Sequence, residues 1–250
     1  MPTPFCVAIL ADIHGNLAAL QAVLADVHAQ APDALLWGGD LVMNGPRPAE
    51  TLALVRELGG WGVVGNTDLD VLDGNDVVAA WTRAQIDAAD LDYLRSLPLM
   101  QRITPPNGTS PEDDLLVVHS TPRDCNDLLI LHIHPLGTSF TTTTPPAEAQ
   151  TMLNGERANL IVYGHIHYAS EAVINERRVM SVGSVGFPFD ADQRATYALA
   201  QWDGTHWQIV HRRVEYDWRA VIADIHRCGI PFPACYAERI RRADWLPRTQ

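Results

Sequence analysis

Side chains of the types that bind metal ions follow five predicted strands of this sequence, each at the point where the strand ends. They are Asp12 and His14 after residues 5–11, Asp40 after 34–37, Asn66 after 61–64, His119 after 115–118, and His165 with His167 after 160–163. The carboxyl ends of strands in an open parallel sheet lie along one edge, so residues far apart in sequence can meet in one crevice. The sequence therefore predicts a metal site at that edge.

The donor types and their spacing limit what such a site could bind. Residues two apart in an extended chain point to the same side, which pairs Asp12 with His14 and His165 with His167. Each pair could hold one ion or span two. Carboxylate, imidazole and amide donors together suit manganese, iron, zinc, cobalt or nickel, and they do not choose among these metals.

The elements that must position these residues alternate between strands and helices in the first third of the chain. Helical spacing of apolar residues covers 17–27 and 49–58. Asp12 and Asp40 are 28 residues apart, and Asp40 and Asn66 are 26 apart, close to the roughly 30 residues of a strand-helix-strand unit. Parallel strands joined by helical crossovers are therefore expected.

The rest of the chain predicts further helices, hairpins and one insertion. Helices are expected over 76–97, 148–153 and 217–228, hairpins over 171–182 and 196–215, and an inserted cap or loop over 123–146. The hairpins would form a second sheet stacked on the first. The basic tail at 239–248 predicts a solvated surface helix. No linker divides the chain, so residues 1–250 are expected to form one domain.

The composition excludes several classes of protein. The 250 residues are 47% hydrophobic, which is typical of a globular protein, and the net charge of −12 disfavours a partner as extended as nucleic acid. Neither a membrane span nor a signal peptide is evident, which predicts a cytoplasmic protein. The four cysteines form no Cys-x-x-Cys pair and are expected to be reduced thiols, with Cys6 buried.

Together and in this order, the predicted ligands resemble the calcineurin-like metallophosphoesterase superfamily, in its small bacterial phosphodiesterase-like branch. The matching blocks are Asp12-Ile13-His14, Gly39-Asp40, Gly65-Asn66-Thr67-Asp68, His119 and Gly164-His165-Ile166-His167. With the order of elements, the resemblance implies an α/β fold of four layers, α/β/β/α, in which two stacked mixed sheets are flanked by helices.

The resemblance also implies a centre of two divalent metal ions, with manganese favoured. One ion would be held by Asp12, His14, Asp40 and His167, and the other by Asp40, Asn66, His119 and His165. Asp40 would bridge the two ions. A hydroxide shared by them would attack the phosphorus of a small phosphodiester, such as a cyclic nucleotide or a nucleotide-derived ester. Asn66 would contribute a neutral oxygen that limits the negative charge of the centre.

One departure from the family pattern bears on the substrate. Many members have histidine where this chain has Thr67, and a hydroxyl cannot act as a general acid near neutral pH. This difference favours diesters with good or strained leaving groups. Asp68 is expected to orient a metal-ligating histidine. Arg123 could neutralise a phosphate oxygen through a forked hydrogen bond or could form a surface ion pair.

Several alternatives stay open at this point. The enzyme could be a phosphomonoesterase or protein phosphatase, including one acting on dinucleoside polyphosphates, or the fold could serve as a protein-binding scaffold without activity. His132 and His134 could protonate a leaving group, although an exposed loop without a role is favoured. Asn16 is expected to cap the helix that begins at Leu17 rather than to contact phosphate. The sequence does not indicate the oligomeric state.

Overall fold

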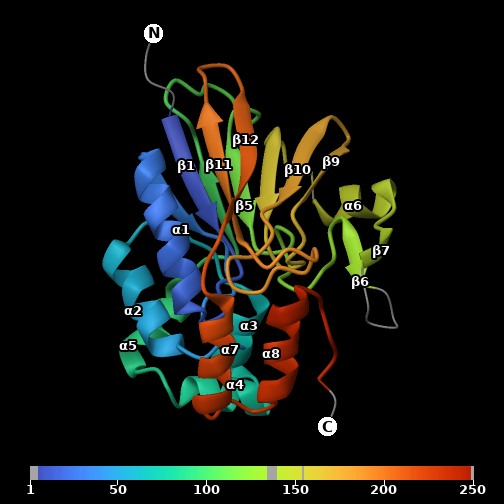
Figure 1. Cartoon of the computed structure of the whole chain (residues 1–250). Helices are drawn as coiled ribbons and strands as arrows, with labels where there is room; N and C mark the ends of the chain where they lie inside the picture. The colour runs from blue at the N-terminus through green and yellow to red at the C-terminus, as the bar shows by residue number, and fades with distance from the viewer. Residues whose placement is uncertain (1–4, 134–139, 154, 249–250) are drawn as a thin grey trace.

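The computed structural model describes residues 5–133, 140–153 and 155–248 and contains two five-stranded sheets (Figure 1). The first sheet has the order β12-β11-β1-β2-β3, with β1 Phe5–Leu10, β2 Ala34–Trp37, β3 Trp61–Gly62, β11 Ala195–Trp202 and β12 Trp207–Val214. The second has the order β4-β5-β8-β10-β9, with β4 Met100–Ile103, β5 Leu115–Val118, β8 Leu160–Tyr163, β9 Ser170–Ile174 and β10 Arg177–Ser181. A separate two-stranded sheet joins β6 Leu131–Ile133 to β7 Phe140–Thr143.

Eight helices complete the described part of the chain. They are α1 Leu17–Gln30, α2 Pro48–Leu58, α3 Asn66–Asp73, α4 Val77–Arg83, α5 Ala88–Ser96, α6 Pro146–Met152, α7 Trp218–Arg227 and α8 Pro233–Arg242. In Figure 1, α1 and α2 lie beside the first sheet, α6 lies beside the second, and α3, α4, α7 and α8 lie below the lower ends of the sheets. None of the helices in the described part has the length and hydrophobicity that a bilayer crossing requires.

The four predicted layers follow from the alternation of side chains along β1. Val7 and Ile9 pack between the two sheets, in one apolar cluster with Val117 and Val162 of the second sheet. The intervening residues of β1 belong to another cluster, which includes residues of α1, α7 and α8. A third cluster joins the outer face of the second sheet to α6. The α/β/β/α arrangement expected from the sequence is therefore confirmed.

One expectation about the elements is wrong, and two elements were missed. The predicted hairpins do not form a separate sheet, because β11–β12 extends the first sheet from β1 and β9–β10 extends the second from β8. The second sheet therefore has a parallel centre with an antiparallel strand at each edge, whereas the first sheet is parallel from β1 to β3 and antiparallel only at β11 and β12. In addition, α3 and β4 were not expected. The four cysteines are free, and Cys6 is buried as predicted.

Candidate metal centre

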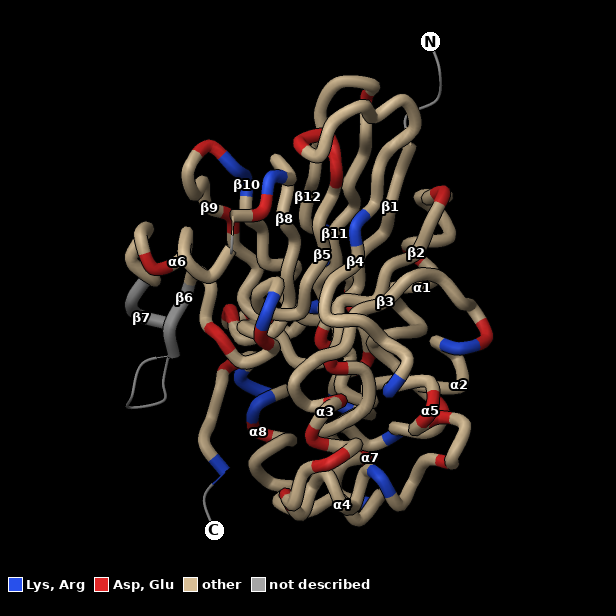
Figure 2. Tube along the Cα trace, turned by 180° about the vertical axis from the view of Figure 1, so that it is seen from behind, with Lys and Arg blue, Asp and Glu red and all other residues tan. Residues whose placement is uncertain are grey.

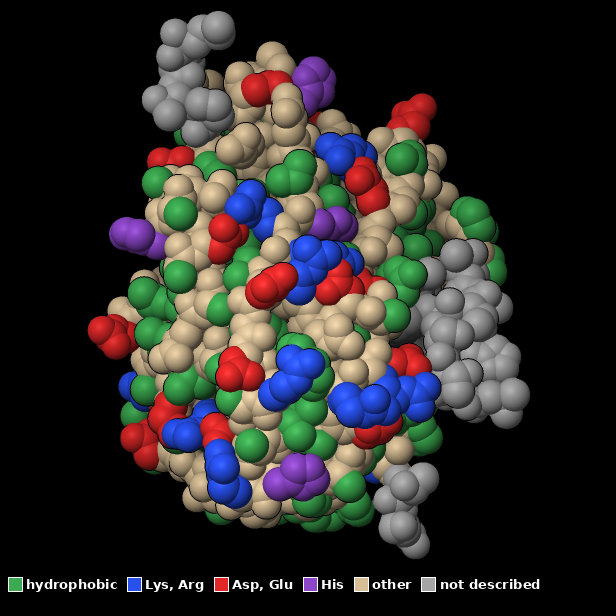
Figure 3. Space-filling view, in the orientation of Figure 1, with side chains coloured by type: hydrophobic (Ala, Val, Ile, Leu, Met, Phe, Trp, Pro, Cys, Tyr) green, Lys and Arg blue, Asp and Glu red, His purple; other side chains and the backbone are tan. Residues whose placement is uncertain are grey.

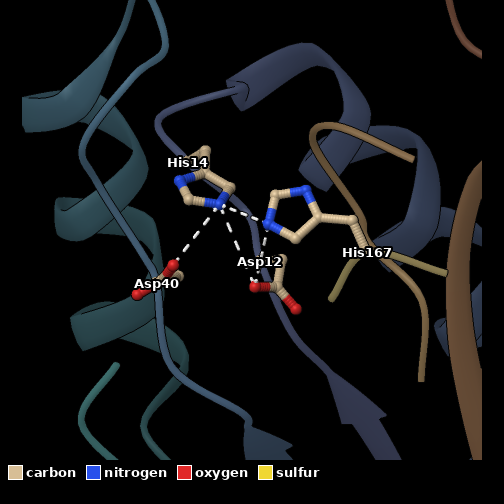
Figure 4. Close-up of side chains that lie close together, drawn as sticks. All are labelled: Asp12, His14, Asp40 and His167. Atoms are coloured by element: carbon tan, nitrogen blue, oxygen red, sulfur yellow. Dashed lines mark hydrogen bonds and ion pairs between the residues drawn. The ribbon is translucent and has the colours of Figure 1, made fainter. Parts of the chain in front are cut away.

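Four predicted ligands from three loops form one buried cluster (Figure 4). Asp12, His14, Asp40 and His167 each offer an atom that could bind a metal ion, and these atoms lie within 4.8 Å of one another. Nε2 of His14 lies 3.0 Å from Nε2 of His167 and 3.5 Å from Oδ2 of Asp40. Nε2 of His167 lies 3.2 Å from Oδ1 of Asp12. The side chains thus point at one common position.

A second group adjoins the first on the other side of Asp40. Oδ1 of Asn66 lies 3.0 Å from Nε2 of His119 and 2.9 Å from Nδ1 of His165. Nε2 of His119 also lies 3.4 Å from Oδ1 of Asp40. One carboxylate oxygen of Asp40 therefore faces His14 and the other faces His119. The structure brings all seven predicted ligands together, although they come from loops of both sheets.

Backbone carbonyl groups set the orientation of three of the histidines. Each ring places Nδ1 against a carbonyl oxygen, which fixes the ring and directs Nε2 into the cluster. The pairs are His14 with Met43 (2.9 Å), His119 with Gly38 (2.8 Å) and His167 with Phe187 (2.6 Å). His165 uses the opposite nitrogen, because its Nε2 lies 3.2 Å from the carbonyl oxygen of Asn126 and Nδ1 faces Asn66.

This donor set fits a divalent cation. Nδ1 of His14 and Nδ1 of His167 each face a backbone carbonyl oxygen, which leaves the lone pairs of the two Nε2 atoms, 3.0 Å apart beside a carboxylate oxygen of Asp12, to bind a metal ion. Lone pairs this close repel each other unless a cation lies between them. Imidazole, carboxylate and amide oxygen are ligands that first-row divalent metals accept.

The ionisation of the cluster agrees with this fit. Burial lowers the pKa of His14 and of His165 to about 4, so both rings are neutral ligands near pH 7. Burial alone would lower the pKa of His119, but the carboxylate of Asp40 raises it to about 10. Burial alone would raise the pKa of Asp40, but His119 holds it below the usual aspartate range. A cation that binds between these two groups must displace the His119 proton.

The backbone at the cluster adopts an uncommon conformation. Five of the ligands have positive φ: Asp12 (55°), His14 (51°), Asp40 (55°), His165 (68°) and His167 (58°). The expectation that an extended chain pairs Asp12 with His14 and His165 with His167 is therefore wrong, because each pair lies on a left-handed turn. Non-glycine residues in this region cost roughly 1–3 kcal/mol each and are typical of functional sites.

Two glycines make the close approach of these loops possible. A Cβ atom at Gly65 would lie 2.1 Å from Oδ1 of Asp40, and one at Gly164 would lie 2.5 Å from Oδ2 of Asp12. Any larger residue at either position would therefore displace a predicted ligand.

Comparison with known proteins identifies the family. The sequence profile described as calcineurin-like phosphoesterase matches residues 6–169 of this chain. The chain belongs to that family. It is 28% identical over 237 residues to an uncharacterized protein of Methanocaldococcus jannaschii, covering 90% of this chain and 93% of that protein. The symmetrical bis(5'-nucleosyl)-tetraphosphatase of Vibrio cholerae is 34% identical over 138 residues, covering 48% of this chain and 51% of that enzyme. The chain thus spans about half the length of that relative.

Two solved structures have the same fold as this chain. A metallophosphoesterase from Sphaerobacter thermophilus superposes with a TM-score of 0.72 at 26% identity, covering 96% of this chain and 100% of that one. A hypothetical protein from Pyrococcus horikoshii superposes with a TM-score of 0.74 at 19% identity, covering 98% and 99%. The likeness extends over both sheets and the C-terminal helices, beyond the residues that the family profile matches.

Asp68 does not have the expected partner. Its carboxylate accepts hydrogen bonds from the backbone N–H groups of Asp40 (2.8 Å), Leu41 (2.9 Å) and Gly65 (3.0 Å), and none from a histidine among the described residues. Asp68 lies on α3, a helix that the sequence analysis did not predict. Its carboxylate therefore faces the backbone of the loops at Asp40 and Gly65 and not an imidazole ring. Burial, followed by repulsion from Asp40, raises the pKa of Asp68 to about 7. Asp68 therefore holds two loops of the cluster together.

Arg123 does not reach the cluster. Thr121 and Asp124 close a tight turn through hydrogen bonds of 2.9 and 3.1 Å, and Arg123 lies exposed on the outside of that turn. The structure shows neither a place for it at a bound phosphate nor an ion pair with a described residue. Arg123 was expected near the cluster because it follows His119 by only four residues. Closeness in sequence did not show where its side chain lies, because the turn reverses the direction of the chain.

The remaining predicted residues have mixed outcomes. Asn16 caps α1 as expected, because its Oδ1 accepts a hydrogen bond from the backbone N–H of Ala19 at 3.1 Å. His134 and the side chain of His132 lie outside the described residues. The insertion at 123–146 contains β6 and β7.

A cavity of about 170 Å³ opens onto the cluster and exposes residues that the sequence analysis missed. Predicted ligands form one wall: His14, Asp40, Asn66, His165 and His167. The other lining residues include Thr67, Phe189, Arg239 and Trp245. Arg239 belongs to the basic tail that was expected to be solvated. Only the packing of α8 onto the loops, which sequence spacing does not reveal, could have identified it.

Proposed function

We propose that this chain hydrolyses small phosphodiesters with the help of two divalent cations. Asp12, His14, Asp40 and His167 would hold one cation, and Asp40, Asn66, His119 and His165 the other. The observation that carries the proposal is the position of Asp40, whose two carboxylate oxygens face two separate groups of nitrogen and oxygen donors. Family membership supports phosphoester hydrolysis as the class of reaction.

The residues of the centre would each have a definite part in catalysis. Divalent cations held there would acidify a water molecule and neutralise charge on the phosphoryl oxygens. Asp40 supplies the shared negative charge, and Asn66 adds an oxygen without adding charge. The backbone carbonyl groups keep the histidine rings in place, so that no reorientation is needed when substrate enters. Asp68 fixes Asp40 through its backbone N–H.

Thr67 supports the choice of diesters with good leaving groups. Its side chain is buried and lines the cavity beside Asn66, and its hydroxyl has no hydrogen-bond partner among the described residues. A hydroxyl stays neutral at pH 7 and is a poor general acid, so the leaving oxygen must depart with little help from this position.

A second candidate function is hydrolysis of dinucleoside polyphosphates. The symmetrical bis(5'-nucleosyl)-tetraphosphatase of Vibrio cholerae supports it, because that enzyme is 34% identical to this chain over 138 residues. The leaving group in polyphosphate hydrolysis is a nucleotide phosphate, whose negative charge is stable without protonation. This reaction therefore also needs no strong general acid.

Turnover of three substrates would test these proposals. The protein, loaded in turn with manganese, iron, zinc, cobalt and nickel, is assayed on an aryl phosphodiester, an aryl phosphomonoester and a symmetrical dinucleoside tetraphosphate. Preference for the diester supports the first proposal, and preference for the tetraphosphate supports the second. Preference for the monoester contradicts both, and no turnover with any metal favours a scaffold.

Other predictions accompany this proposal without a direct test. One domain over residues 1–250 is supported by the apolar cluster that α1 shares with α7 and α8. A cytoplasmic location is consistent with four free cysteines. Manganese is the first metal to test.

A further inference from the structure

Arg239 of α8 is a half-buried cation without a carboxylate partner among the described residues. Most other arginines in that part of the chain form ion pairs, such as Arg213 with Asp190 and Arg212 with Asp26. Burial lowers the pKa of the Arg239 guanidinium, and no carboxylate offsets this loss of solvation. The group nevertheless stays charged near neutral pH. An unpaired, partly buried charge is unfavourable unless an anion can join it.

The contacts of Arg239 fix the guanidinium but leave part of it free. Nε donates a hydrogen bond to the carbonyl oxygen of Leu246 at 2.8 Å, and Nη2 donates to the same atom. The rings of Tyr236 and Trp245 lie 5.3 and 5.8 Å from the guanidinium carbon. The side chain of Cys235 also interacts with the guanidinium, and Nη1 forms no hydrogen bond to an oxygen atom in the described part of the chain. The side chain is therefore positioned in advance, with one donor group available to a ligand.

Arg239 lines the same cavity as the predicted metal ligands. Helix α8 is attached to that site, because the hydroxyl of Tyr236 donates a hydrogen bond of 2.8 Å to Oδ1 of Asn44, which also lines the cavity. At about 170 Å³ the cavity is smaller than the ~300 Å³ at which pockets for drug-sized ligands begin. It has room for the phosphoryl part of a substrate while the rest lies outside.

The surroundings of the cavity make a local cation important. The net charge of the chain is −12, and acidic residues gather around α3, which begins at Asn66 (Figure 2). An approaching phosphate is repelled by this field. The arginines on the exposed face of α8 do not offset it, since acidic side chains lie beside them (Figure 3). Arg241 pairs there with Glu238, and Arg242 lies 3.5 Å from Asp244.

We propose that Arg239 binds an anionic phosphoryl oxygen of the substrate through Nη1, opposite the metal ligands. This inference rests on the proposed function and deepens it, because it names the residue that would select a phosphate group. It also assigns to the C-terminal helix the part that the sequence analysis gave to Arg123. A purely structural part for Arg239, as the anchor of Leu246, is the alternative that an experiment must separate.

Inorganic phosphate is a suitable probe because its binding can be measured without turnover. Calorimetry would compare the wild type with Arg239→Gln and Arg239→Lys, each with and without bound manganese, and steady-state kinetics would give kcat and KM on the best ester. Arg241→Gln is the matched control, since Arg241 lies two residues away on the same helix, is exposed and pairs with Glu238. Melting temperatures would report whether each variant folds.

Arg239→Gln is expected to weaken phosphate binding and to lower kcat/KM by about 10- to 100-fold, the typical value of one hydrogen bond to a charged group. Arg239→Lys keeps the positive charge but lacks the planar guanidinium, so it should lose less phosphate affinity and less kcat/KM than Arg239→Gln. Arg241→Gln should match the wild type. If Arg239→Gln does not fold, the phosphate affinity of Arg239→Lys tests the inference in its place.

Wild-type phosphate affinity in folded Arg239→Gln, or in Arg239→Lys where Arg239→Gln does not fold, would overturn the inference and leave Arg239 as an anchor of the tail. Failure of the proposed function has a different signature, because the wild type itself would then prefer the phosphomonoester or hydrolyse no ester with any metal. Turnover by the wild type with unchanged kinetics in the Arg239 variants would remove only the part given to Arg239.

Discussion

The two parts of this chain differ in what they contribute to one cavity. Residues 6–169, which match the family profile, provide all seven predicted ligands and the carboxylate of Asp68 that holds their loops. The C-terminal third provides the carbonyl of Phe187 that orients His167 and the wall with Arg239 and Trp245. In the proposed function, the metal-binding residues thus lie in the part that matches the family profile, and the C-terminal part adds Phe189, Arg239 and Trp245 to the cavity wall. Substrate preference in such proteins should vary with the C-terminal part.

The largest effect is expected from Asp40→Asn, which tests whether the N-terminal part alone contains the chemistry. Loss of the shared charge should release bound metal and lower turnover by more than the roughly 100- to 1,000-fold that follows loss of one oxyanion donor. Metal content by mass spectrometry and kcat would be measured together. Asp92→Asn, at an exposed side chain on α5, is the control. An active Asp40→Asn variant would be fatal to the proposed centre.

His14→Ala and His119→Ala should each remove one ion from a centre of two. The two rings lie on opposite sides of Asp40, so each variant should keep the ion that the other loses. The metal content should fall from two per chain toward one, with a loss of about 1–3 kcal/mol in unfolding free energy from the unpaired carbonyl group. His206→Ala, in the exposed turn between β11 and β12, should change neither. An unchanged metal content in both ligand variants would contradict two separate sites.

Thr67→His would add a general acid to the part of the cavity wall that residues 6–169 provide. If protonation of the leaving oxygen limits the rate, turnover of an ester with a poor leaving group should rise by up to about 100-fold. Thr67→Gln fills similar space without a group that titrates near pH 7, and it should give no gain. No gain with histidine either would mean that another group already supplies the proton.

The smallest effect is expected at a contact that joins the two parts and has no place in the cavity. Asp26 of α1 binds Arg212 of β12 through two hydrogen bonds of 2.7 and 2.9 Å and also accepts one from Tyr197. The hydrogen bond to Arg212 lowers the pKa of Asp26. Because the folded pKa lies below the unfolded value of about 3.9, the stabilisation is present above pH 4 and is lost as pH falls through the folded pKa.

Asp26→Asn should therefore lower the unfolding free energy at pH 7 by about 0.5–1 kcal/mol, as is usual for a partly exposed pair. Denaturant titrations of both proteins at pH 7 and pH 3 would measure it, and the difference should shrink at the lower pH. Turnover at pH 7 should not change. A loss of turnover would show that this contact also positions the cavity wall.

Local pattern predicted the strands and the ligands but not the directions in which the chain turns. The runs at 34–37, 115–118 and 160–163 match β2, β5 and β8, since each is a short apolar segment bounded by turn residues. The hairpins were recognised as hairpins, but their sheets were not, because pairing of β11 with β1 joins residues almost 200 positions apart. A strand's own residues carry no signal for a partner so distant.

Within the site, the ligand types were predictable and their supports were not. The predicted ligands follow predicted strands in an order that resembles the family pattern, and the position and the resemblance together indicated them. The partners of Asp68 are backbone N–H groups, which every residue except proline has, and no sequence pattern marks them. Arg123 and Arg239 have the same side chain, and only the tight turn at one and the docked helix at the other decide which of them enters the cavity.

The close contacts of Gly65 and Gly164 have a consequence for genetics. A methyl group at either position would overlap a carboxylate of Asp40 or Asp12. A screen of random mutants for inactive protein should therefore recover changes at these two glycines as often as at the aspartates themselves. Residues with no functional group would then rank among the least replaceable in the chain.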